Sequence, residues 1–220
     1  MDKLVVKTAV KAVLVILCAV LVAFAVFNLA FPQHMATLWE NTGNYAIAVK
    51  YTDLRYKYTG DGSDLARCFD DSVLAVDNEI IISYGNELIA RSDFAEICEK
   101  KDELFSEGLY GTLKYKNTVY SEIARAYYRR GFDGDLVRAV KIAAEGTPST
   151  SFEYGNPLMS LAAKIRTSKD GNGAELMLLA LNGSEEYGFV GIHPTDEKEI
   201  VYLEAVKEAM QGVISAPQAL

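Results

Sequence analysis

The chain has 220 residues, of which 50% are hydrophobic and 24% charged, a composition typical of a folded protein rather than a disordered one. Its formal net charge is −8, with 22 Lys and Arg against 30 Asp and Glu. A surface this acidic repels phosphate backbones, so the composition argues against nucleic-acid binding.

The first predicted element is a transmembrane helix. Residues 12–33 carry no charge, and residues 12–31 contain one strongly polar side chain, Asn28. Twenty helical residues with a rise of about 1.5 Å each extend about 30 Å, the thickness of a bilayer core. A buried helix of a soluble protein is rarely apolar on all faces over this length. We therefore predict that residues 12–32 span the membrane and contact the lipid bilayer.

The flanking charges predict the orientation of this helix. Lys3, Lys7 and Lys11 precede it, whereas the first Lys or Arg after it is Lys50. The positive-inside rule then makes residues 1–11 a cytoplasmic basic tail and places the rest of the chain outside the cytoplasm, on a single-pass protein of the cell membrane.

Two other interpretations of this segment are a cleaved signal peptide and a lipoprotein signal sequence. Ala23-Phe24-Ala25 has the small-x-small form of a signal-peptide cleavage site, but the apolar run continues past it and exceeds the usual core of about 7–15 residues. Cys18 would be the lipidated residue of a lipoprotein, but Leu17 is bulkier than the small residue that usually precedes such a cysteine. An uncleaved signal-anchor is the preferred interpretation.

Residues 33–215 show helical periodicity interrupted by short Gly/Asp turns, and no stretch alternates with a period of two over a useful length. Asp64, Asp93 and Asn156, the last followed by Pro157, are predicted N-caps. The fold class is therefore all-α: one N-terminal transmembrane helix, then an extracytoplasmic domain of helical hairpins, then a tail over 216–220. The predicted helices cover residues 34–41, 45–59, 64–77, 79–91, 93–107, 117–131, 135–146, 157–168, 174–183 and 196–211.

The hairpins recur irregularly along the chain. Helices that start near Asp64, Asp93, Asp135 and Ala174 each follow a turn, at separations of 29, 42 and 39 residues. These separations are close to those of stacked helix-pair repeats. One hairpin cannot bury its apolar face, whereas several stacked hairpins can.

Ala36, Trp39, Gly43, Tyr45 and Ala48 follow the spacing small-x2-aromatic-x3-Gly-x-aromatic-x2-Ala, which resembles a tetratricopeptide repeat. Two weaker matches follow at Ala124, Tyr127, Gly131, Leu136 and Ala139, and at Ala162 and Ile165. The resemblance implies that small residues let paired helices approach and that aromatic residues fill the gap between them. It also implies a solenoid with a concave protein-binding surface, and no particular ligand.

The sequence contains no recognisable catalytic or cofactor motif. His34 and His193 lack partners at zinc-ligand spacing, and phosphate-binding Gly loops, nucleophile elbows and dinucleotide fingerprints are missing. Asp-rich stretches at 61–64, 133–135 and 170–175 lack the EF-hand order of ligands, and Asp and Gly there suit turns and N-caps. We therefore expect no metal ion, no cofactor and no enzymatic activity.

Cys68 and Cys98 lie in helical patterns with apolar neighbours. This pattern indicates buried free thiols, although an oxidising compartment would permit a disulfide between adjacent helices.

Tyr127, Tyr128, Arg129 and Arg130 form the candidate partner-binding patch, since Tyr and Arg are enriched in interface hot spots. In the simpler interpretation Tyr127 packs in the core, while the two arginines face solvent and favour the C-terminal end of their helix.

These observations favour a membrane-anchored helical-repeat protein that mediates protein–protein interaction or assembly at the outer face of the membrane. Its partner would be another membrane or envelope protein. A membrane-anchored enzyme acting on envelope material is one alternative, and it requires paired Asp or Glu side chains in one cleft. A ligand-binding sensor is the other, and a cytoplasmic tail of about 11 residues gives little material for inward signalling.

Overall fold

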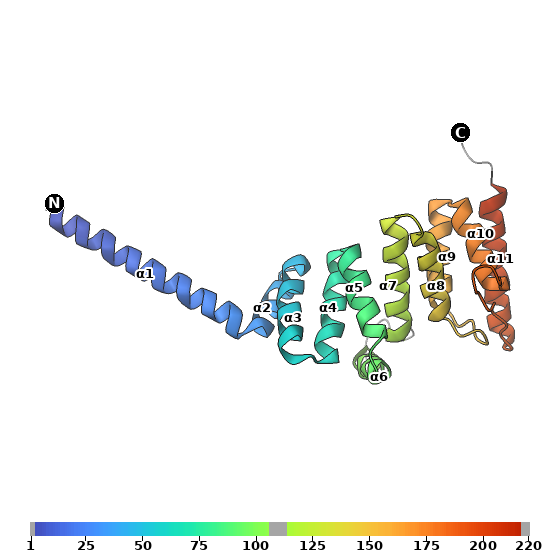
Figure 1. Ribbon diagram of the computed structural model, residues 1–220, viewed down its shortest axis with the longest axis horizontal. Helices are drawn as coiled ribbons and strands as arrows, with labels where there is room; N and C mark the ends of the chain where they lie inside the picture. Colours follow the sequence, from blue (N-terminus) through green and yellow to red (C-terminus); the bar gives the residue numbers. More distant parts are fainter. Residues whose placement is uncertain (1–2, 106–113, 217–220) are drawn as a thin grey trace. The chain divides into compact units, whose positions relative to one another are not determined.

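The computed structural model describes residues 3–105 and 114–216, and within these ranges every regular element is a helix (Figure 1). The predicted all-α fold class is confirmed to that extent. Most of the predicted tail at 216–220, and residues 106–107 of one predicted helix, lie outside the described ranges. Contacts divide the chain into two units, Met1–Asp71 and Ser72–Leu220, and each is considered by itself.

The first helix, α1 (Lys3–Ala30), is long and apolar enough to span a membrane. Its most apolar section, Val10–Ala30, has a mean hydropathy of 2.9, and none of it is buried against the rest of the chain. The helix begins at Lys3, so most of the predicted basic tail continues the same helix. It ends at Ala30, because Pro32, which has no backbone N–H to donate, opens the next helix as its first residue.

The rest of the first unit consists of α2 (Pro32–Asn41), α3 (Tyr45–Thr59) and most of α4 (Gly62–Ala75), which passes the boundary at Asp71. Helices α2 and α3 pack against each other as an antiparallel pair (Figure 1). Gly43 lies in their turn with φ +74°, a left-handed conformation that costs other residues free energy. Ala36 and Ala48 are fully buried, as expected of small residues where two helices approach closely.

Helix α4 starts two residues earlier than predicted, and Asp64 is not its N-cap. Asp61 Oδ1 accepts a 2.8 Å hydrogen bond from the Ser63 N–H at the start of the helix. Asp64 lies inside the first turn, accepts a 2.7 Å hydrogen bond from the Thr59 hydroxyl, and pairs with Arg55 at 2.7 Å. Its carboxylate therefore joins α4 to α3.

The second unit contains α5 (Asn78–Ile89), α6 (Phe94–Phe105), α7 (Tyr115–Arg130), α8 (Asp135–Glu145), α9 (Pro157–Ser168), α10 (Gly171–Asn182) and α11 (Glu197–Ser215). Helix α7 contacts α5, α6, α8 and α9, while α9 contacts α8, α10 and α11. Thus α7, α9 and α11 form one row of neighbouring helices, and α8 and α10 form a second row that packs against it. The core between the rows includes Phe152, Leu158, Leu161, Ile165, Met177, Leu181 and Met210.

Side-chain caps determine where several of these helices begin. Asn156 accepts from the Met159 N–H at 2.9 Å, as predicted for the Asn-Pro start of α9. Asp170 accepts from the Gly173 N–H at 3.0 Å, so α10 begins at Gly171, within a Gly-rich stretch that was predicted to be a turn. Asp93 precedes α6 as predicted, but its carboxylate binds Arg91 through two hydrogen bonds of 2.7 and 2.8 Å.

A buried carboxyl group, Asp71 of α4, lies close to the half-buried Glu40 of α2. Asp71 is 3% exposed, and its Oδ2 has no hydrogen-bond partner among the described residues. Burial and the neighbouring Glu40 carboxylate raise the pKa of Asp71 to about 7. Arg67 donates two hydrogen bonds to Glu40, at 2.7 and 2.8 Å, so this guanidinium is bound to the other carboxylate.

We expect this carboxyl to make stability depend on pH. Its pKa in the folded chain is raised above the unfolded value of about 3.9. The folded state therefore binds the extra proton, and stability falls as pH rises from about 4 to about 7. Asp71→Asn removes this dependence. The Tm of the Asp71→Asn variant minus the Tm of the unmodified chain should therefore increase between pH 5 and pH 8. Circular dichroism of the detergent-solubilised full chain measures it, and a pH-independent difference would contradict the assignment.

Candidate functional site

The predicted patch lies at the C-terminal end of α7, and the side chain of its Arg130 is bound to other side chains of the second unit. Arg130 donates to Asp135 Oδ2 and Oδ1 at 2.7 and 2.8 Å, and to Glu79 Oε2 at 2.9 Å. Asp135 is fully buried and also accepts from the Phe132 N–H at 3.1 Å. The Arg130 guanidinium accordingly lowers the pKa of Asp135. With a side chain only 14% exposed, Arg130 does not face solvent, contrary to the simpler interpretation.

The other three side chains of the patch also bind neighbouring helices. The Tyr127 hydroxyl accepts from Asn86 on α5 at 3.2 Å. The Tyr128 hydroxyl donates to Asp170, the N-cap of α10, at 3.1 Å. Arg129 donates to Asn78 on α5 at 2.9 Å. The four residues thus connect α7 to α5, α8 and α10, and a role for them in partner binding stays a prediction.

A more open surface follows the row formed by α7, α9 and α11. It consists of two adjoining hollows of about 370 and 300 Å³, which share Tyr154, Met159 and Ala163. We call this surface the α9 groove. Its remaining lining residues are Ala162, Arg166, Thr167, Tyr202, Ala205, Val206, Ala209, Met210, Thr118, Ser121, Glu122, Arg125, Gly155 and Ser160.

The α9 groove combines exposed aromatic rings with a floor of small residues. Tyr154 is 68% exposed and Tyr202 is 39% exposed, and their ring centroids lie 6.3 Å apart. Alanines of α9 and α11 leave the space that the two rings flank. Exposed apolar surface of this kind, bordered by polar groups, is typical of protein-interaction sites.

The charged side chains of the α9 groove are mainly basic, although the chain as a whole is acidic. Arg125 pairs with Glu122 at 2.7 Å. Arg166 is exposed and forms no ion pair with any residue of the described ranges. The groove therefore offers a free cation next to its apolar floor.

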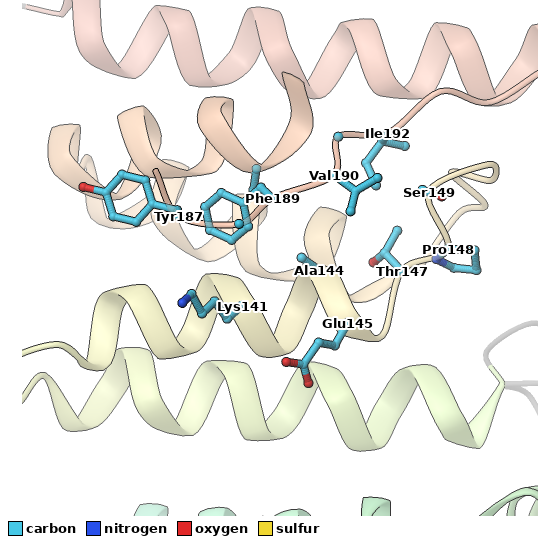
Figure 2. Close-up of a pocket in the computed structure, with 13 residues that line it drawn as sticks. Lys141, Ala144, Glu145, Thr147, Pro148, Ser149, Tyr187, Phe189, Val190 and Ile192 are labelled. Carbon is cyan, nitrogen blue, oxygen red and sulfur yellow. The ribbon is translucent and has the colours of Figure 1, made fainter. Parts of the chain in front are cut away.

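A larger cavity of about 590 Å³ lies beside the second row, between α8 and the segment after α10 (Figure 2). Tyr187 and Phe189 stack at 5.9 Å along it, and Lys141 lies close by (Figure 2). The Thr147 hydroxyl donates to the Ala143 carbonyl at 2.9 Å and accepts from the Leu158 N–H at 3.3 Å, so it is used within the fold. The figure shows the Glu145 carboxylate pointing away from the aromatic pair. We find no nucleophile–base pair among the residues that line this cavity.

The residues considered for metal or thiol chemistry are dispersed. Within the described ranges, no three His, Cys, Asp or Glu side chains are close enough to hold a metal ion. His193 is exposed, and its backbone N–H donates to the Ser149 carbonyl at 2.6 Å. Cys68 and Cys98 are buried free cysteines, as the simpler interpretation predicts, and burial raises the pKa of both thiols to about 12. Both are protonated at neutral pH and are poor nucleophiles.

Comparison with protein-family models, with curated proteins and with solved structures finds no match to this chain. The geometry of its surfaces is therefore the basis for inferring what it does. Sequence reasoning missed the α9 groove because the groove is formed by residues of three helices and one loop. The only local signal was the exposed aromatic residue Tyr154 directly before the Asn-Pro start of α9.

We expect Asp135→Asn to destabilise the second unit strongly, because it leaves the half-buried Arg130 without its buried counter-ion. Breaking one partner of a buried ion pair costs about 3 kcal/mol, which corresponds to a fall in Tm of roughly 6–12 °C for a chain of this size. Thermal unfolding of the full chain in detergent measures the change.

Arg138→Gln is the matched control. Arg138 pairs with the same Asp135 at 3.3 Å but is 59% exposed. Its removal should change stability by less than about 0.5 kcal/mol. Equal effects of the two substitutions would show that the Arg130–Asp135 pair stabilises the fold no more than the exposed Arg138–Asp135 pair does.

Proposed function

We propose that this chain is a single-pass membrane protein whose helical-repeat domain binds another envelope or membrane protein through the α9 groove. The observation that carries the proposal is the groove itself: an exposed aromatic pair, a floor of alanines and an exposed arginine on one row of helices. The role is assembly or scaffolding, and no step of covalent chemistry is involved.

The anchor is α1, with its N-terminal end in the cytoplasm and the domain on the opposite side. Its exposed apolar side chains support insertion, because water would otherwise contact Val, Leu, Ile and Phe on all sides of the helix. The lysines before the span and their scarcity after it support the orientation. Anchoring restricts the domain to the membrane surface, which raises the local concentration of partners that are themselves in the membrane.

The domain is a tetratricopeptide-like solenoid in this proposal. Support comes from the residues that match the repeat spacing. Ala124 of α7 and Ala139 of α8 are fully buried, like the two alanines of the α2–α3 pair. Gly131, which ends α7, has φ +68°, so it takes the left-handed conformation found at Gly43 in the first turn. In such an arrangement the α7, α9, α11 row presents one continuous binding surface.

The occupant best suited to the α9 groove is an amphipathic helix of the partner protein. Its apolar side would lie on the alanine floor between Tyr154 and Tyr202, in the manner of helix-in-groove recognition. An acidic side chain at its edge would pair with the exposed Arg166.

A photocrosslinking amino acid at position 202 of the membrane-embedded full chain tests the groove. We expect it to give one dominant cross-linked protein in native membranes. Position 201 is the matched control, because Val201 lies on the same helix, is 65% exposed and does not line the groove. Arg166→Glu should weaken cross-linking at position 202 without changing Tm. Cross-linking that is equal at both positions and insensitive to Arg166→Glu would argue against the groove as the binding site.

Protease protection in sealed membrane vesicles tests the orientation. In vesicles with the cytoplasmic face outward, the domain after α1 should resist added protease until detergent opens the membrane. Release of the chain by alkaline carbonate, or digestion of the domain in intact vesicles of this sidedness, would overturn the anchor or its orientation respectively.

A further inference from the structure

A hydrogen bond connects the end of the apolar helix to the first helical hairpin. The Tyr51 hydroxyl on α3 donates to Asn28 Oδ1 on α1 at 2.6 Å. The Asn28 side-chain N–H donates in turn to the Phe24 carbonyl at 2.6 Å. The single strongly polar side chain of the predicted span thus has partners for both its oxygen and its nitrogen.

This bond sets the depth of α3 relative to the bilayer. Asn28 lies two residues before Ala30, the last residue of the apolar helix. At about 1.5 Å per residue it is about 3 Å from the end of the span. If α1 crosses the membrane, the Tyr51 phenol must therefore lie at the boundary between hydrocarbon and headgroups.

The C-terminal end of α3 also lies close to the end of α1. Phe31, which follows α1, and Arg55 and Tyr58 of α3 line one hollow of about 340 Å³. Tyr58 is 67% exposed and Phe31 is 48% exposed. Residues 51, 55 and 58 are spaced at i, i+4 and i+7, so they share one side of the helix. We call Tyr51, Arg55 and Tyr58 the α3 face.

The charge of the segment that contains α3 is compatible with a position at the membrane surface. Residues 33–60 contain three basic and two acidic side chains, whereas residues 61–220 contain sixteen basic and twenty-seven acidic ones. Arg55 pairs with Asp64 and Lys57 with Asp53, so the segment that carries the α3 face is close to neutral, and anionic headgroups repel it less than the acidic remainder. Tyr is moreover the residue type, with Trp, that is enriched at membrane–water interfaces, because its ring is apolar and its hydroxyl is polar.

We propose that the α3 face lies in the interfacial layer of the bilayer and contacts lipid headgroups, so that α3 is a second membrane-contacting element beside α1. This inference rests on the proposed membrane anchor. Its occupant is the lipid surface, and the hydrogen bond to Asn28 makes the face continuous with the span.

Single-tryptophan variants of the full chain test this placement. The chain has one tryptophan, Trp39, and Trp39→Phe provides a background for placing tryptophan at one chosen position. Phe24→Trp reports the anchor and Tyr58→Trp reports the α3 face. Tyr154→Trp is the matched control, because Tyr154 and Tyr58 are 68% and 67% exposed. Each variant is reconstituted into vesicles of phosphatidylcholine and phosphatidylglycerol, with or without bromine on the acyl chains near the headgroups.

Bromine quenches tryptophan only at close range, so we expect Tyr58→Trp to be quenched at least about twofold more than Tyr154→Trp, as an interfacial side chain would be. If Phe24→Trp is quenched but Tyr58→Trp is quenched no more than Tyr154→Trp, the inference is overturned and the anchor is not affected. Absence of quenching at Phe24→Trp would overturn the anchor and the inference together. If Trp39→Phe changes the circular dichroism spectrum, the same comparison is made with Trp39 retained and its own quenching subtracted.

Discussion

A helical hairpin buries one apolar side between its two helices and leaves another side uncovered, and this constraint organises the second unit. Helix α7 packs on α5, α8 and α9 at once, and α9 then packs on α8, α10 and α11. Each helix is therefore covered by the next along the chain. Helix α11 follows the last complete pair, so its outer side carries exposed apolar residues such as Val201. The α9 groove lies where this sequential packing leaves small side chains between larger ones.

Polar connections hold the packed helices in register. Arg130, Tyr127 and Tyr128 sit on the last turns of α7 and reach α5, α8 and α10. Hydrophobic packing alone tolerates sliding of one helix past another, whereas a bidentate Arg–Asp pair accepts one geometry. The first unit uses the same device, since Arg67 of α4 binds Glu40 of α2. Burial and the Glu40 carboxylate raise the pKa of Asp71, which lies beside this pair, to about 7.

Periodicity and capping rules located nearly all of the helices, because each depends on residues close together in the chain. The start of α10 was missed: glycines at 171 and 173 resemble a turn until Asp170 is seen to cap them. Asp135 was predicted only as the first residue of a helix after a turn, whereas its fully buried carboxylate forms a bidentate ion pair with Arg130. That pair joins the end of one helix to the start of the next, and local patterns do not reveal whether such residues are buried. The α9 groove was beyond sequence reasoning for the same reason, since exposure of Tyr154 and Tyr202 depends on how α9 and α11 pack.

The distribution of charge separates the two surfaces to which we assign functions. A strongly acidic chain is repelled by anionic lipid and by other acidic proteins, so any attractive surface must be locally neutral or basic. The segment at 33–60 and the α9 groove with its exposed Arg166 are two such places. The first belongs to the unit that contains the apolar helix, and the second belongs to the helical rows of the other unit. In this proposal membrane contact and partner binding use different parts of the chain, and the net negative charge of the remainder disfavours either interaction elsewhere.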